Sequence, residues 1–209
     1  MKIAIFYHIA QIGELSAFIY QQQLHRLYTS GLIDSADYIH FGVNGYQELF
    51  NVPDKAIIKQ NSNWEEETDT LISLKEFCDE NSDYKVLYFH TKGVSRPTIA
   101  VSAWRLMMEY FVIDRWKDCI DKLSSYNAVS CCLSGDVPPY SFVGNFWWAD
   151  SSYIQTLSYY YLSTKNRTDR EHWISTGYNF NPKALYKLEV HNNSLYWDIH
   201  SEFNYIVSK

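Results

Sequence analysis

The sequence predicts a three-layer α/β domain in which a mixed, mainly parallel β-sheet is flanked by helices. Three observations support this fold class. Residues 2–9 form an almost continuous apolar run, which is typical of a strand buried on both faces. Residues 14–29 then place apolar side chains at helical spacing, and residues 36–41 return to a strand pattern, which completes a βαβ unit. With 209 residues and no visible linker or repeat, we expect a single domain spanning 1–209.

The following elements extend the sheet. Gly31 lies just past the first helix, where a glycine commonly ends helices. Residues 56–59 predict a short strand, and residues 65–78 predict a helix whose acidic start suits the positive end of a helix dipole. Residues 84–89 (YKVLYF) predict the central strand, which ends at the tetrapeptide HTKG. The site should therefore be sought where this strand stops.

The second half of the chain predicts further helices and strands. Residues 102–123 carry apolar side chains on one face and predict the longest helix. Residues 127–133 predict a strand, 135–144 a loop and 145–149 a strand or strand edge. Residues 151–162 and 171–177 predict helices, and residues 184–190 form a strand-like run.

Charge and cysteine content exclude several classes of protein. There are 18 Lys and Arg against 24 Asp and Glu, a net charge of −6, which argues against binding nucleic acid by neutralising phosphates. No apolar run approaches the roughly 18 residues of a membrane span, and the first nine residues lack a cleavage signal, so we expect a cytoplasmic protein. The four cysteines lack metal-ligand spacing and predict buried free thiols.

Aromatic residues are unusually frequent. The chain has 18 Tyr, 11 Phe and 7 Trp, or 17% in total. Tyrosine and tryptophan combine an apolar body with a hydrogen-bonding group. This composition fits a sugar or nucleoside pocket without proving one.

Polar residues follow two of the predicted strands. Sheets of this kind bind ligands beyond the carboxyl ends of their strands. These ends carry Tyr7 and His8 after the first strand, and His90, Thr91, Lys92 and Gly93 after the central strand. Lysine can bind phosphate, threonine supplies a hydroxyl, glycine lets backbone approach a ligand, and neutral histidine accepts a hydrogen bond or binds metal. The alternatives are a diphosphate-binding corner or a turn with a solvated lysine.

Together with these motifs, the order of elements resembles the GT-A fold of nucleotide-sugar glycosyltransferases. The strand with HTKG, then Trp104-Arg105, then NFWWA and the segment from Arg170 to Ile174 are similar to small bacterial and viral glycosyltransferases, including a domain of chlorella viruses. The resemblance implies a Rossmann-like transferase acting in a bacterial cell or virus-infected host. The implied donor is a nucleoside diphosphate sugar, with a UDP-sugar favoured, and the acceptor is a hydroxyl on a glycan or glycoconjugate.

The resemblance leaves metal binding open. Where that fold usually carries Asp-X-Asp, which holds a divalent cation, this chain has His90, Thr91 and Lys92. Either Lys92, with Arg96 or Arg105, neutralises the leaving diphosphate without metal, or His90 joins His191 and an acid in an atypical site for Mn2+ or Mg2+.

Catalysis by an inverting route needs a carboxylate to take the acceptor proton, and Asp150 and Glu171 are the candidates. Asn145 and Trp147 lie where the resemblance implies sugar contacts. Strand alternation sends Trp147 and Trp148 to opposite faces, so at most one lines a pocket.

Two other classes of function compete with this prediction. One is a non-catalytic carbohydrate- or nucleotide-binding protein with the same fold. A nucleotidyltransferase ranks last, because residues 9–13 contain one glycine and no lysine or arginine.

Overall fold

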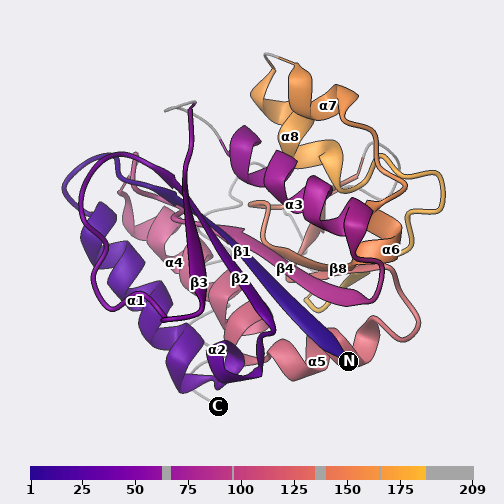
Figure 1. The fold of residues 1–209 in the computed structure, drawn as a ribbon, viewed down its shortest axis with the longest axis horizontal. Coiled ribbons are helices and arrows are strands. Elements are labelled where there is room, and N and C mark those ends of the chain that lie inside the picture. The colour runs from indigo at the N-terminus through magenta and orange to yellow at the C-terminus, as the bar shows by residue number, and fades with distance from the viewer. Residues whose placement is uncertain (63–66, 96, 135–139, 165, 187–209) are drawn as a thin grey trace.

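The computed structural model describes residues 1–62, 67–95, 97–134, 140–164 and 166–186 (Figure 1). Its centre is a seven-stranded sheet in the order β3-β2-β1-β4-β8-β5-β9. The strands are β1 (Lys2–Ala10), β2 (Tyr38–Asn44), β3 (Ala56–Gln60), β4 (Tyr84–His90), β5 (Ala128–Ser130), β8 (Trp147–Asp150) and β9 (Pro182–Ala184). The first four are parallel, and β8 runs antiparallel to both β4 and β5. The predicted fold class, a mixed and mainly parallel sheet flanked by helices, is confirmed.

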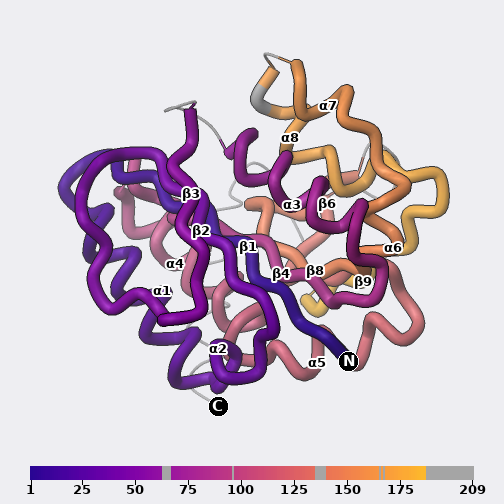
Figure 2. The backbone as a smooth tube through the Cα atoms, in the orientation of Figure 1, coloured from indigo at the N-terminus to yellow at the C-terminus, as the bar shows by residue number. Residues whose placement is uncertain are grey.

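Helices cover both faces of the sheet (Figures 1 and 2). One layer holds α1 (Ser16–Thr29), α2 (Leu32–Ser35), α4 (Ile99–Glu109), the π-helical turn η1 (Tyr110–Asp114) and α5 (Trp116–Lys122). The other holds α3 (Thr68–Glu80), α6 (Ser151–Ile154), α7 (Tyr160–Ser163) and α8 (Arg167–Trp173). Two apolar cores therefore lie on either side of one sheet.

Strand β1 separates these two cores. Ile5 and Tyr7 face the layer of α1 and α4, while Ala4 and Phe6 face the layer of α3. All four side chains are fully buried. The apolar run at the N-terminus thus reflects burial on both faces, as expected for a strand between parallel neighbours.

Several element boundaries differ from those predicted. The helix predicted at 102–123 is divided into α4, η1 and α5, and the helix predicted at 151–162 is divided into α6 and α7. Strand β2 begins and ends later than predicted, and the predicted loop contributes part of a small two-stranded sheet of β6 (Leu133–Ser134) and β7 (Ser141–Phe142). Most of the strand-like run 184–190 lies outside the described residues.

Helix caps explain two of the shifted starts. Helix α4 begins earlier than predicted because the Thr98 hydroxyl accepts a hydrogen bond from Val101 N at 3.2 Å. Helix α8 also begins early, because the side chain of Asn166 accepts one from Thr168 N at 3.2 Å. Side-chain caps of this kind satisfy backbone donors that the first helical turn leaves without partners.

The π-helical turn η1 widens the long helical segment by one residue. The Arg115 amide bonds to the Tyr110 carbonyl at 3.0 Å, five residues back. Such wide turns often mark functional regions. Here the turn presents Asp114 to Arg26 of α1, with which it forms an ion pair.

The cysteines are buried free thiols, as the sequence predicted. All four cysteines are free and buried, and burial raises the pKa of Cys78 and Cys119. Among the residues that the structure describes, no helix is both long and apolar enough to cross a bilayer.

Candidate functional site

The candidate site lies at the carboxyl ends of β1 and β4, where His8 and His90 are register partners on neighbouring strands. Glu67, which precedes α3, Trp104 of α4 and the segment before β8 join them. We call this group the carboxyl-edge cluster and define it as His8, Glu67, Tyr88, His90, Thr91, Lys92, Gly93, Trp104, Gly144 and Asn145.

Thr91 and Gly93 set the backbone after β4. The Thr91 hydroxyl is buried and accepts a hydrogen bond from the Ala10 amide at 2.9 Å, which joins the end of β1 to the end of β4. Gly93 has a φ of +94°, and a Cβ there would lie 3.2 Å from Val101 Cγ1. Glycine is suited to this left-handed conformation, so the tight turn after Lys92 depends on it.

Lys92 is half-buried rather than a solvated turn residue. Its Nζ lies 3.9 Å from the centroid of the Trp104 ring. The electron-rich face of an indole attracts a cation at this distance. The ammonium group is therefore held beside α4, unlike the solvated lysine of the second alternative, and diphosphate binding stays a prediction.

Glu67 is the acidic residue that sequence reasoning missed. It immediately precedes α3, and its Oε2 accepts a short hydrogen bond from the Tyr88 hydroxyl. Its Oε1 accepts another from Asn145 Nδ2 at 3.1 Å. The sequence placed Glu67 only in an acidic helix start, because nothing in the chain signals that residues 67, 88 and 145 meet.

Asn145 is held rigidly toward Glu67. Its φ of +57° is left-handed, a conformation that asparagine adopts more readily than most residues. Its Oδ1 accepts a hydrogen bond from Trp147 Nε1 at 2.8 Å, which leaves Nδ2 to face the carboxylate. The hydrogen bonds from Trp147 to Asn145 and from Asn145 to Glu67 thus orient the Glu67 side chain before a ligand binds.

The two histidines have different surroundings. Burial lowers the pKa of His8 to about 4, although Glu67 opposes the shift, so its ring is neutral at pH 7. His8 Nδ1 lies 3.0 Å from the Thr70 hydroxyl oxygen. His90 Nε2 lies 3.0 Å from the Gly144 carbonyl oxygen, and because a carbonyl only accepts, Nε2 carries the proton.

The lowered pKa of His8 predicts a loss of stability in acid. In the unfolded chain, His8 binds a proton near pH 6.5, whereas in the folded protein it does so only near pH 4. The free energy of unfolding should therefore fall as the pH is lowered between these two values. For this one group, the fall is at most about 1.4 kcal/mol per pH unit. His40, whose pKa burial also lowers to about 4, adds to the effect. Urea unfolding from pH 7 to 4.5 should show a shallower pH dependence in His8→Asn than in the unaltered protein. Identical curves would contradict this assignment.

Two residues predicted to meet ligand are core residues instead. Tyr7 is fully buried, and its hydroxyl donates to Gln23 Oε1 at 2.6 Å. Trp147 and Trp148 face opposite cores, as strand alternation predicted, but both are fully buried. Trp147 packs against Tyr88, so its indole face is closed to a sugar and its role is to orient Asn145.

Arg105 is buried and paired within the fold. Its side chain is 4% exposed and forms an ion pair with Glu109, one helical turn later, at 2.7 Å. It also donates to Gln22 Oε1 at 2.9 Å. The prediction that Arg105 contacts diphosphate is therefore replaced by a structural role between α1 and α4.

Of the two predicted catalytic carboxylates, Asp150 does not join the cluster. Asp150 pairs with Lys85 at the start of β4, which is the opposite edge of the sheet. The cause is the direction of β8, which brings its first residue, not its last, to the carboxyl edge. Glu171 is half-buried on α8 and stays a prediction.

The predicted metal site is not completed by the described residues. His191 and Arg96 lie outside them. Within the part of the chain that is described, no three His, Cys, Asp or Glu side chains are grouped to hold a metal ion. Mg2+ and Mn2+ prefer several oxygen ligands, and His90 has already committed Nε2 to a carbonyl. Because His191 is not described, the predicted site for Mg2+ or Mn2+ stays a prediction, and we derive no step through such an ion.

A cavity of about 290 Å³ lies beside the cluster. It is formed by the end of β1, the start of α1 and the loop after β2, with Ile9, Gln11, Ser16, Tyr20 and Phe50 in its wall. Gln11 is fixed by two hydrogen bonds to the Gln47 backbone, at 2.6 Å and 2.8 Å. No sequence pattern indicated this cavity, because its wall combines three distant segments.

Fold and site define an α/β protein whose candidate ligand site lies at the carboxyl edge of a mainly parallel sheet. Residues 10–193 match the family described as "Domain of unknown function (DUF8361)", and the chain belongs to that family. No curated protein matches it. Among solved structures, the chain is similar to 2-C-methyl-D-erythritol 4-phosphate cytidylyltransferase from Thermus thermophilus, with 9% identity, a TM-score of 0.40, and coverage of 98% of this chain and 100% of that one.

Proposed function

We propose that this protein is a cytoplasmic glycosyltransferase that moves a sugar from a nucleoside diphosphate sugar to a hydroxyl group on a glycan or glycoconjugate. A UDP-sugar is the favoured donor. The observation that carries the proposal is a held cation, Lys92, and an oriented carboxylate, Glu67, on the same sheet edge. In inverting sugar transfer without a metal, a cation stabilises the leaving phosphate and a carboxylate takes the acceptor proton.

Lys92 is proposed to bind the diphosphate of the donor. As the bond to the sugar breaks, negative charge grows on the departing phosphate, and a fixed ammonium group stabilises it. The turn at Gly93 lets the ligand approach the backbone closely. Because Thr91 is occupied by the Ala10 amide, its hydroxyl supports this turn, and we assign the charge contact to Lys92 alone.

The cavity beside β1 is proposed to take the nucleoside. Its wall combines apolar atoms of Ile9 and Phe50 with the amide of Gln11 and the ring of Tyr20. The Tyr20 hydroxyl is fixed by the Phe50 carbonyl at 2.9 Å, which keeps the ring in place. A mainly apolar wall with a few fixed polar groups is the usual character of small-molecule sites.

Glu67 is proposed to accept the proton of the acceptor hydroxyl. It takes the role first predicted for Asp150, and Glu171 remains the second candidate. Asn145 keeps the carboxylate in position. Neutral His8, whose pKa is lowered by burial, places no charge beside the reacting groups at pH 7.

Replacing Lys92 by alanine tests the proposal. The expected result is a loss of UDP affinity of about 1.5–3 kcal/mol, the range for a charged hydrogen bond, measured by titration calorimetry. Lys117→Ala is the matched control, because Lys117 also lies over a tryptophan, 5.5 Å from the Trp116 ring, but on α5. Unchanged affinity in a folded Lys92→Ala protein would remove the central assignment. Donor binding without transfer to any acceptor would favour the non-catalytic alternative.

A further inference from the structure

A second cavity, of about 510 Å³, lies between α1 and the segment of α4 and η1. Its wall is formed by Gln22, His25, Arg26 and Thr29 of α1, the following Ser30, Leu106 of α4 and Asp114 of η1. It shares no residue with the carboxyl-edge cluster or the cavity beside β1. We propose that this cavity is a binding site for an uncharged saccharide.

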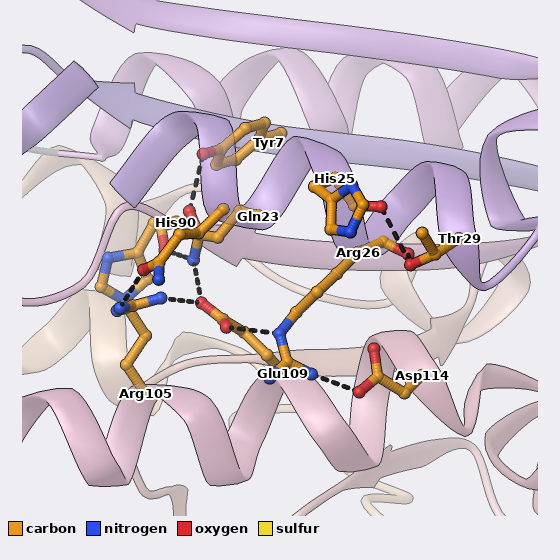
Figure 3. A network of polar contacts seen from close by, with 10 residues as sticks. Tyr7, Gln23, His25, Arg26, Thr29, His90, Arg105, Glu109 and Asp114 are labelled. Carbon is orange, nitrogen blue, oxygen red and sulfur yellow. Dashed lines mark hydrogen bonds and ion pairs between the residues drawn. The ribbon is translucent and has the colours of Figure 1, made fainter. Parts of the chain in front are cut away.

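The charges in the wall argue for a neutral ligand. Arg26 forms ion pairs with Asp114 and with Glu109, the latter at 3.2 Å, as Figure 3 shows. Glu109 is paired with Arg105 as well. Within the wall the Arg26 guanidinium is paired with the Asp114 carboxylate, and behind the wall Arg105 is paired with Glu109, so these charges balance. An anion would be repelled by the carboxylates and a cation by the guanidinium groups, so neither gains a net attraction.

The wall offers both a hydrogen-bond donor and a hydrogen-bond acceptor. Gln22 Oε1 accepts from Arg105 at 2.9 Å, which leaves the Gln22 amide nitrogen as a donor. Thr29 donates its hydroxyl proton to the His25 carbonyl at 3.0 Å, and its oxygen can still accept. Each hydroxyl of a sugar both donates and accepts, and therefore matches such a mixed set. Leu106 supplies apolar surface for the C–H face of a ring.

A buried network behind the wall holds Arg26 through its ion pair with Glu109. Glu109, fully buried, accepts a hydrogen bond from Gln23 Nε2 at 2.8 Å, and Gln23 donates to the His90 carbonyl at 3.0 Å. Side chains fixed by such a network lose little further freedom when a ligand binds. The volume lies within the range of small-molecule sites.

The test uses saturation-transfer NMR and titration calorimetry with maltose, cellobiose and lactose, and with glucuronate as a charged comparison. We expect at least one neutral disaccharide to bind and glucuronate to bind more weakly. Thr29→Phe places a ring at an exposed position in the cavity wall and should weaken binding by about tenfold. Ser35→Phe is the matched control. Ser35 lies on the neighbouring helix α2, is likewise exposed, and donates its hydroxyl proton to the Gly31 carbonyl four residues earlier.

The outcomes separate this site from the proposed function. Thr29→Phe should leave UDP affinity unchanged, so a loss of disaccharide binding alone assigns the saccharide to the cavity between α1 and α4. Gln22→Leu, which removes the amide, provides a second variant should the first fold poorly. The proposal is overturned if none of the three disaccharides binds, if binding is equal in Thr29→Phe and Ser35→Phe, or if glucuronate binds better than the neutral sugars.

Discussion

Glu67→Gln is expected to lower the rate of sugar transfer by about 10²–10⁴-fold, the contribution usual for a positioned proton acceptor. The amide cannot take the acceptor proton, but it has the shape of the carboxylate. The Tyr88 hydroxyl can accept as well as donate, so both contacts of the Glu67 side chain can be kept. Because Glu67 is assigned to the acceptor, the UDP affinity should not change.

The measurement is steady-state transfer from a donor that titration has first shown to bind. Glu76→Gln serves as the control, since Glu76 is exposed on α3, the helix that Glu67 immediately precedes. Glu171→Gln distinguishes the two carboxylates. A large loss in that variant, with normal rates in Glu67→Gln, would return the role of proton acceptor to α8.

Glu109→Ala is expected to lower the free energy of unfolding by about 3–5 kcal/mol, as is usual when one partner of a buried ion pair is removed. Glu109 is 0% exposed and pairs with Arg105, which is 4% exposed, and with Arg26. Without the carboxylate, the Arg105 guanidinium stays buried but loses its ion pair, and it keeps the hydrogen bond to Gln22. The Gln23 amide loses an acceptor as well.

Urea unfolding of Asp118→Ala gives the comparison. Asp118 and Arg115 form an ion pair three residues apart on the surface, with side chains 46% and 50% exposed. An exposed pair of this kind contributes at most about 1 kcal/mol. If Glu109→Ala and Asp118→Ala lowered the free energy of unfolding equally, burial of Glu109 would not make its ion pairs more stabilising than an exposed pair.

The sequence predicted the sheet better than the helices. Strands β1 and β4 stand out because both faces are buried, which leaves an apolar run that no helix pattern matches. Gly31, with a φ of +71°, follows α1 as predicted. The divisions between α4 and α5 and between α6 and α7 were not predicted, because apolar spacing continues across both breaks. Only local hydrogen bonds, such as the Ser158 hydroxyl accepting from Tyr160 N at 3.1 Å, show where a new helix starts.

For the site, the sequence located the strand ends but not their partners. His90 and Lys92 were predictable, because they follow an evident strand. Glu67 was not, since its contacts join three segments that only the fold brings together. Asp150 was misplaced because the direction of β8 cannot be read from a five-residue pattern. Arg105 could have been assigned correctly, because Glu109 stands four residues later, where helical side chains meet.

The wide turn at Tyr110–Asp114 carries one more residue than an α-helix would use there. In an ordinary α-helix, one added residue would rotate everything downstream by about 100°. The wide turn takes up its extra residue locally, so Trp116 and Cys119 still face the apolar layer that they fill. An insertion within α5, where no wide turn absorbs it, would instead turn the side chains that follow it away from that layer.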